Sequence, residues 1–260
     1  MSMLTVVESN GVATVSLNRP ELHNAFNAEL IQELTHTFQG LARQDIRLVV
    51  LTGAGTSFCA GADLNWMSSM VKYSEEENFQ DAKKLAGLFR SLNELPCPVI
   101  GLINGHALGG GAGLVSCCDY VLASSKALFG FTEARLGLIP AVISPYVIAK
   151  IGESQARAWF LSGERFDAQQ AKQMNLVHEV VAPEAMSEAL ENVKKRFLVA
   201  GPVAAREAKK LVTRVMQRHE PSEVLENETC RRIAKLRISA EGQDGMQALL
   251  SKSKPKWVTP

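Results

Sequence analysis

The chain has 260 residues and a mass of 28.3 kDa, enough for one large domain or two modest ones whose core needs no disulfide or metal. Its 46% hydrophobic and 21% charged residues exclude a disordered chain, and its net charge of +1 excludes a protein held to nucleic acid by bulk charge. No apolar run reaches the roughly 20 residues of a membrane span, and the first residues lack the basic and apolar parts of a signal peptide, so we expect a cytoplasmic protein.

The first part of the chain alternates strand-like runs with helical patterns. Two β-rich runs, Leu4–Glu8 and Val12–Leu17, flank Asn10-Gly11, a pair typical of a hairpin turn. Apolar residues then recur at helical spacing up to Leu41, and Asn27 is placed to cap that helix. Two strands followed by a helix begin the alternation that is typical of an α/β fold.

The same cycle repeats further along. The apolar run Arg47–Thr52 is too short for a helix and predicts a strand, and a long helical pattern ends at Pro96 and Pro98. The next cycle comprises the strand Val99–Ile103, a glycine-rich turn, an apolar helix at Ala112–Cys118, and strands at Tyr120–Ala123 and Ala127–Phe129. This alternation predicts an α/β fold with a buried sheet.

From about Val193 the strand signals vanish, and we expect an α/β unit over 1–192 followed by a helical module over 193–260. Residues 191–260 carry 15 Lys and Arg against 8 Asp and Glu, whereas residues 1–190 carry 13 against 19. The basic excess is compatible with solvated helix faces, a phosphate-bearing ligand, an acidic neighbouring subunit or RNA.

Two glycine-rich loops, Ser57–Leu64 and Asn104–Ala112, each follow a predicted strand. Glycine lets the backbone approach a ligand closely, and small residues before a helix leave free N–H groups. One N–H from each loop could stabilise a developing oxyanion. Each loop alone could also be a tight turn or bind phosphate, although the second lacks the Lys-Ser/Thr of a P-loop.

The order of several motifs resembles the crotonase (enoyl-CoA hydratase/isomerase) superfamily. The resemblance runs along almost the whole chain and rests on Asn18-Arg19-Pro20 with Asn24-Ala25, the two glycine-rich loops, Pro96–Gly101, Phe129–Pro140, Leu161-Ser162-Gly163 with Ala168–Ala171, and Glu241-Gly242 through Trp257. It implies a crotonase-type spiral of repeated ββα units with a C-terminal helical oligomerisation module, which forms trimers or dimers of trimers.

The resemblance also implies an acyl-CoA thioester substrate, with no metal and no cofactor besides the coenzyme A of the substrate. The oxyanion hole of the family consists of two backbone N–H groups, which match Ala62 and Gly110. The residues that match the CoA-binding segments are Leu22, His23, Ala25, Ala60, Asp63 and Leu64. We expect Asp63 also to orient its loop through backbone hydrogen bonds.

Hydratases of this family usually have two glutamates, and this sequence keeps only one of them. Glu133 matches the second, whereas Gly113 stands where a GGGxE pattern has the first. With two carboxylates one activates water while the other protonates C2. With one, Glu133 serves both transfers in turn, another group holds the water, or the reaction needs a single base. Taken alone, Glu133 could instead be a solvated cap or an ion-pair partner.

The segment Ala141–Ile148, together with GGGAGLVSCCD, resembles bacterial methylglutaconyl-CoA hydratases of leucine breakdown and the hydratases of longer glutaconyl-CoAs. The expected function is therefore reversible addition of water to the 2,3 double bond of a branched 2-enoyl-CoA. The alternatives are an enoyl-CoA isomerase that uses Glu133 alone, a non-catalytic acyl-CoA-binding protein, and an RNA-binding protein. The last is disfavoured because the predicted helix Asn27–Ala42 contains no Lys or Arg.

Other reactive side chains are given structural roles. The five cysteines show no CxxC pattern and no ligand spacing with histidine, so neither a disulfide framework nor a metal site is expected. Cys117 and Cys118 lie in an apolar helix and are predicted to be core residues. His106, beside the glycines, is interpreted as a packing residue rather than a base.

Overall fold

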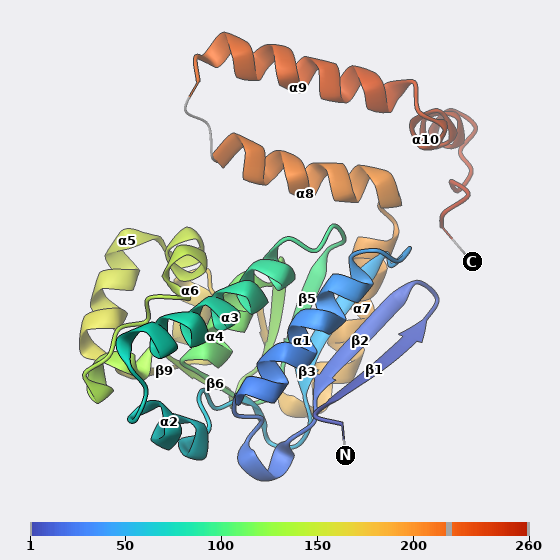
Figure 1. Cartoon of the computed structure of the whole chain (residues 1–260). Coiled ribbons are helices and arrows are strands. Elements are labelled where there is room, and N and C mark those ends of the chain that lie inside the picture. Colours follow the sequence, from blue (N-terminus) through green and yellow to red (C-terminus); the bar gives the residue numbers. More distant parts are fainter. Residues whose placement is uncertain (1, 217–219, 259–260) are drawn as a thin grey trace.

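A computed structural model describes residues 2–216 and 220–258, and it contains two sheets (Figure 1). The six-stranded sheet has the order β1-β2-β3-β5-β7-β10, in which only β1 and β2 are antiparallel. The four-stranded sheet has the order β4-β6-β8-β9, in which only β8 and β9 are antiparallel. The strands are β1 Leu4–Ser9, β2 Val12–Leu17, β3 Leu48–Gly53, β4 Ser57–Cys59, β5 Val99–Ile103, β6 His106–Leu108, β7 Tyr120–Ser124, β8 Leu128–Gly130, β9 Arg165–Asp167 and β10 Glu179–Val181.

Three consecutive ββα units generate this arrangement. In each unit the first strand (β3, β5 or β7) joins the large sheet, the second (β4, β6 or β8) joins the small one, and a helix follows. Because each unit adds its strands beside those of the unit before, equivalent loops end up as neighbours. The structure therefore has the repeated ββα spiral that the resemblance implied.

The helices and 3-10 turns complete the chain. Their bounds are η1 Pro20–Leu22, α1 Ala28–Leu41, α2 Leu64–Met70, α3 Glu75–Asn93, α4 Gly110–Cys117, η2 Thr132–Leu136, α5 Ser144–Ser162, α6 Ala168–Gln173, η3 Pro183–Ala185, α7 Met186–Leu198, α8 Pro202–Met216, α9 Ser222–Arg237 and α10 Ala240–Leu250. Asn27 caps α1 as predicted, its Oδ1 accepting the Leu30 N–H at 2.8 Å. The helix expected from Ala112 begins earlier, at Gly110, because tertiary contacts override the poor helix propensity of glycine.

The alternation of side chains along β3 divides the core. Val49 and Leu51 face the main core, which α1, α3 and α4 cover, whereas Leu48 and Val50 face a second cluster containing Val193 of α7. The boundary expected at 192/193 therefore falls inside α7, a helix that packs on the large sheet. The helices that leave the sheet begin at α8.

The last three helices, α8 to α10, project from the α/β unit (Figure 1). Basic side chains attach α8 to the loops that precede the parallel strands: Lys209 Nζ donates to Asp119 at 2.7 Å and Arg206 to Asp45 at 3.0 Å. Part of the basic excess of the C-terminal region thus holds the chain's own acidic groups. In the described ranges 2–216 and 220–258, no helix combines the length and apolarity needed to span a membrane.

Candidate active site

Three neighbouring strands of the small sheet deliver the predicted reactive groups. Ala62 follows β4, Gly110 follows β6, and Glu133 follows β8, and these strands are adjacent and parallel. The carboxyl ends of parallel strands meet at one edge of a sheet, so the three loops lie together. A hydrogen bond from Gly109 N–H to Gly130 O at 2.9 Å joins the second loop to the third.

The backbone around Ala62 leaves its N–H without a partner. Phe26 N–H donates to Gly61 O at 2.7 Å, and Asp63 N–H donates to Phe26 O at 2.8 Å, which together form a parallel bridge between Phe26 and Ala62. Successive peptide groups of an extended segment point to opposite sides, so the Ala62 N–H points away from Phe26. Within the described residues, no backbone or side-chain acceptor is recorded for it.

Gly110 supplies a second N–H as the first residue of α4. The first N–H groups of a helix have no intrahelical acceptor and carry partial positive charge. Glycine is required at this position because a Cβ would lie 2.9 Å from Cδ2 of the Phe26 ring. Phe26 thus contacts both loops, holding the first through its backbone and packing its ring against the second.

Glu133 lies beside the second of these loops, and one of its carboxylate oxygens makes no hydrogen bond within the described residues. Its Oε1 lies 3.4 Å from the position that a Cβ would occupy if Gly109 had a side chain. Its Oε2 is buried without a hydrogen-bond partner among the described residues. Burial raises the pKa of Glu133 above its usual value, opposed only by its own backbone N–H. These contacts match neither the solvated cap nor the ion-pair partner considered from the sequence.

Gly113 has no room for a side chain. A Cβ there would overlap Cγ2 of Ile143 and would lie 2.9 Å from Cε1 of Phe89. Both neighbours are buried, so the place where a GGGxE pattern would direct a carboxylate is occupied by apolar atoms. The structure therefore explains why a second glutamate is absent here: the packing excludes it.

The residues that match the CoA-binding segments lie on two adjoining stretches, the turn after η1 and the loop after β4. Ala60 N–H donates to His23 O at 3.0 Å, which joins the two stretches. Leu22 and Leu64 are exposed, whereas Ala25 is buried. His23 has a φ of +50°, and its Nδ1 lies 3.0 Å from Ser57 Oγ.

Asp63 orients its loop as expected. Its Oδ1 caps α2 by accepting the Asn65 N–H at 2.8 Å, and its Oδ2 pairs with Arg19 at 3.0 Å. The carboxylate is directed into the protein, so any contact of Asp63 with a ligand must use its backbone.

Comparisons with known proteins place this chain in a family. The model of the family "Enoyl-CoA hydratase/isomerase" matches residues 7–260. The chain belongs to the enoyl-CoA hydratase/isomerase family. It is 32% identical over 220 residues to a short-chain-enoyl-CoA hydratase of Clostridium acetobutylicum, a match that covers 82% of each chain. It is therefore an enzyme of the enoyl-CoA hydratase type that acts on acyl-CoA thioesters.

Solved structures of the family agree with this fold over nearly the whole chain. An enoyl-CoA hydratase from Shewanella pealeana superimposes with a TM-score of 0.94 at 36% identity, covering 98% of this chain and 96% of that one. Pseudomonas aeruginosa AtuE superimposes with a TM-score of 0.95 at 31% identity, covering 99% of this chain and all of the other. The match includes the C-terminal helices.

Three residues that shape the candidate site were not singled out from the sequence. Phe26 joins the loops, Arg19 pairs with Asp63, and Ile143 fills the space at Gly113. Arg19 belongs to the Asn18-Arg19-Pro20 motif, which pointed to the family but not to a partner for the guanidinium. An apolar residue such as Phe26 or Ile143 carries no chemical signal of its own.

The remaining reactive side chains lie as predicted or stay untested. Cys117 and Cys118 are buried, and burial raises the pKa of the Cys118 thiol to about 12, which leaves it inert at neutral pH. His106 is half-buried in β6, and its Nδ1 has no hydrogen-bond partner among the described residues.

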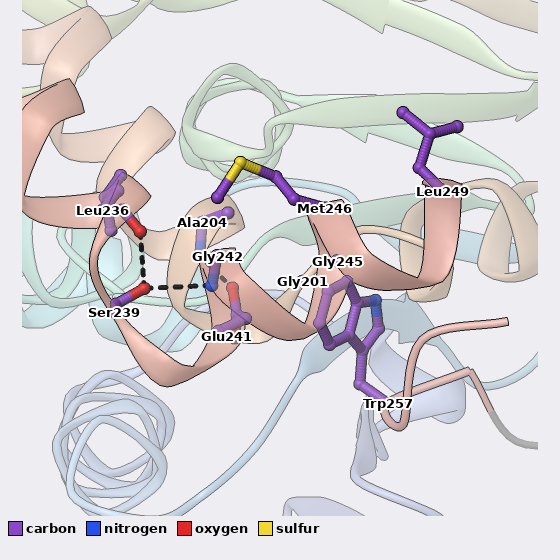
Figure 2. Close-up of a pocket in the computed structure, with 10 residues that line it drawn as sticks. All are labelled: Gly201, Ala204, Leu236, Ser239, Glu241, Gly242, Gly245, Met246, Leu249 and Trp257. Atoms are coloured by element: carbon purple, nitrogen blue, oxygen red, sulfur yellow. Dashed lines mark hydrogen bonds between the residues drawn. The ribbon is translucent and has the colours of Figure 1, made fainter. Parts of the chain in front are cut away.

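A pocket in the C-terminal region belongs to a different part of the enzyme. Figure 2 shows Trp257 and Met246 beside Gly201, Gly242 and Gly245. The one carboxylate there, Glu241, caps α8 by accepting the N–H groups of Val203 at 2.9 Å and Ala204 at 2.8 Å. Its charge is therefore used within the fold, and none of the groups at the β4, β6 and β8 loops reaches this pocket.

Proposed function

We propose that this enzyme reversibly adds water to the 2,3 double bond of a branched 2-enoyl-CoA of the 3-methylglutaconyl-CoA type, with Glu133 as its only acid and base. The observation that carries the proposal is the buried Oε2 of Glu133, which has no hydrogen-bond partner among the described residues and whose carboxylate lies beside Gly109, next to Gly110. The resemblance of Ala141–Ile148 and of the GGGAGLVSCCD segment to methylglutaconyl-CoA hydratases supports the choice of acyl group.

The two N–H groups activate the thioester. Donors at Ala62 and Gly110 would hold the carbonyl oxygen and stabilise the enolate that forms when C3 is attacked. Because these donors are fixed before the reaction starts, they need no reorganisation as the charge develops, and each contributes about 3 kcal/mol to lowering the barrier. The chemistry at C2 and C3 then requires no group from the protein besides a proton carrier.

Glu133 would carry the proton in two steps. Its carboxylate removes a proton from water as the oxygen bonds to C3, and the resulting carboxylic acid delivers that proton to C2 of the enolate. The raised pKa suits this exchange, because a buried carboxylate accepts a proton more readily than an exposed one. One oxygen and two hydrogens are added in total, and Glu133 returns to its starting state.

A second function is favoured by the packing at Gly113. Ile143 and Phe89 leave no place for a second carboxylate, so water has no additional protein base there. An enoyl-CoA isomerase needs only one base, which moves a proton between C2 and C4. The same Glu133 and the same N–H groups would serve that reaction.

CoA recognition and assembly complete the proposal. The exposed residues Leu22, His23 and Leu64, with the half-buried Ala60, would hold the CoA moiety, and no further cofactor is required. The C-terminal helices expose Met216, Ile238 and Leu249, each 78% to 80% accessible, which supports their packing against other copies in a trimer or a dimer of trimers. The module expected over 193–260 includes residues 217–219 and 259–260, which lie outside the described part.

The experiment that tests the proposal compares three substrates side by side. Wild type, Glu133→Gln and the control Glu153→Gln, which alters an exposed glutamate on α5, are assayed with 3-methylglutaconyl-CoA, crotonyl-CoA and a 3-enoyl-CoA. We expect hydration of the branched diacid thioester, lost in Glu133→Gln and retained in the control. Isomerisation of the 3-enoyl-CoA without hydration would establish the second function, and efficient hydration of crotonyl-CoA would refute the proposed acyl specificity.

A further inference from the structure

A buried ion pair lies directly behind the loop that carries Ala62. Arg19 Nη2 and Asp63 Oδ2 are 3.0 Å apart, and their side chains are only 10% and 8% exposed. A buried ion pair is expensive to desolvate and is not by itself a source of stability. Its position beside a reactive loop therefore calls for an explanation other than folding energy.

Arg19 contacts both stretches of backbone at this end of the site. Its Nη1 donates to Ala25 O at 2.6 Å, while Nη2 reaches the side chain of Asp63. Its backbone N–H donates to Oδ1 of the fully buried Asn24 at 2.8 Å. The planar guanidinium thus fixes the distance between the turn after η1 and the loop after β4.

Hydrogen bonds fix both the backbone and the side chain of Asp63. Its N–H donates to Phe26 O, and its two carboxylate oxygens accept from Asn65 N–H and from Arg19. Burial acts to raise the pKa of Asp63, but the hydrogen bonds from Asn65 and Arg19 outweigh it, so the net shift is downward. Asp63 therefore stays ionised at neutral pH and serves as an acceptor, not as a proton donor.

These contacts form a closed ring around Ala62. The chain runs from Arg19 to Ala25 and Phe26, crosses by backbone hydrogen bonds to Gly61 and Asp63, and returns to Arg19 through the ion pair. Gly61 has a φ of +97°, so the ring holds a backbone turn that an ordinary residue would resist. Ala62 is the one residue between the two anchored peptide groups.

We propose that Arg19 and Asp63 are positioning residues that fix the direction of the Ala62 N–H toward the thioester carbonyl. Neither side chain contacts substrate. The inference rests on the proposed function, because Ala62 as an oxyanion donor belongs to it. An oxyanion donor matters most in the transition state, so loss of its alignment lowers kcat and leaves the binding of substrate largely intact.

Arg19→Lys is the variant that tests the positioning role most directly. Lysine keeps the positive charge but has a single ammonium group, which cannot span both Ala25 O and Asp63 as the guanidinium fork does. We expect kcat to fall by about tenfold to a hundredfold, less than the roughly hundredfold to thousandfold for outright loss of a donor, with KM changed by less than about threefold. Asp63→Asn, which keeps an oxygen to cap α2, should act in the same direction.

A spectroscopic measurement separates positioning from general damage. Butyryl-CoA labelled isotopically at its carbonyl carbon is bound to each variant, and the carbonyl stretch is recorded by difference infrared spectroscopy. In the wild type the stretch should shift to lower frequency than in free butyryl-CoA, because the hole polarises the carbonyl. In Arg19→Lys it should move back toward the free value. The control is Asp45→Asn, which removes the Arg206–Asp45 pair between α8 and the loop that precedes β3.

Each result of these measurements supports or refutes the positioning role of Arg19 and Asp63. No shift in the wild type would refute the proposed oxyanion hole and the positioning role with it. A shift that Arg19→Lys and Asp63→Asn retain, or a loss confined to KM, would overturn the positioning role alone. If neither variant folds by circular dichroism, the uncharged pair Arg19→Gln with Asp63→Asn is tested, and its failure to fold would show that the pair serves the fold rather than Ala62.

Discussion

Placing at position 113 the glutamate that the GGGxE pattern has there should damage this enzyme instead of improving it. The Cβ alone would overlap Cγ2 of Ile143 and lie 2.9 Å from Cε1 of Phe89. Overpacking of this kind costs about 1–3 kcal/mol, offset by about 1 kcal/mol because alanine favours a helix over glycine. Gly113→Ala should therefore lower the free energy of unfolding by up to about 2 kcal/mol.

Gly113→Glu adds a charge to the same apolar surroundings. An uncompensated buried charge costs about 3–5 kcal/mol, and a loss of this size lowers the Tm of a protein of this length by roughly 6–20 °C. Widening the space with Ile143→Ala should relieve the overlap, so the double variant should be more stable than Gly113→Glu alone, although the cavity has its own cost.

Thermal unfolding and hydration of crotonyl-CoA test this reasoning together. We expect Gly113→Glu to unfold earlier and to gain no hydratase activity, with Gly113→Ala intermediate in stability. The reasoning is refuted if Gly113→Glu is as stable as the wild type and hydrates crotonyl-CoA faster, since the packing would then not be what excludes a second carboxylate.

Three further predictions concern polar side chains whose pKa or contacts are set by the fold. Glu133→Gln should be more stable than the wild type at neutral pH, because the raised pKa of Glu133 means that its ionisation disfavours folding as pH rises through that pKa; Tm values of the two should converge below pH 4.5. Lys209→Met, which breaks the contacts with Asp119 and Cys97 O, should loosen α8 and cost about 1–3 kcal/mol; unchanged stability and unchanged proteolysis at 198–201 would contradict it. His178 accepts the Val121 N–H through Nδ1, and burial and then Lys150 lower its pKa, so its stabilisation is present above pH 6.5 and is lost as pH falls through the lowered pKa. A His178→Asn variant should show a flatter dependence of Tm on pH between 7 and 5, and equal slopes would count against this assignment.

The site is assembled by repetition of one unit. Ala62, Gly110 and Glu133 are far apart along the chain, but each follows the second strand of a ββα unit. Parallel pairing of β4, β6 and β8 then brings equivalent loops to one edge. The spiral is thus the reason why residues from three units meet, and why the reactive groups lie on short loops held by strands.

Short-range sequence patterns were sufficient to predict several strands, a turn and the family of this protein. Short β-rich and apolar runs predicted β1, β2, β3, β5 and β7. The Asn10-Gly11 pair predicted the hairpin turn, and both of these residues adopt positive φ, at 51° and 75°. The order of glycine-rich loops and the Glu133 motif pointed to the enoyl-CoA hydratase family. These features are readable because periodicity, capping and turn chemistry depend on residues only a few positions apart.

Tertiary structure alone decided how the site is supported. The Arg19–Asp63 pair joins residues 44 positions apart, and Ile143 fills the space at Gly113. Glu133 keeps an oxygen that has no partner in the described part of the chain. None of these follows from spacing, because contacts between distant residues depend on how the ββα units stack. Burial then sets the energetics: the same glutamate would be an ordinary solvated carboxylate on a surface, whereas here packing removes water and raises its pKa.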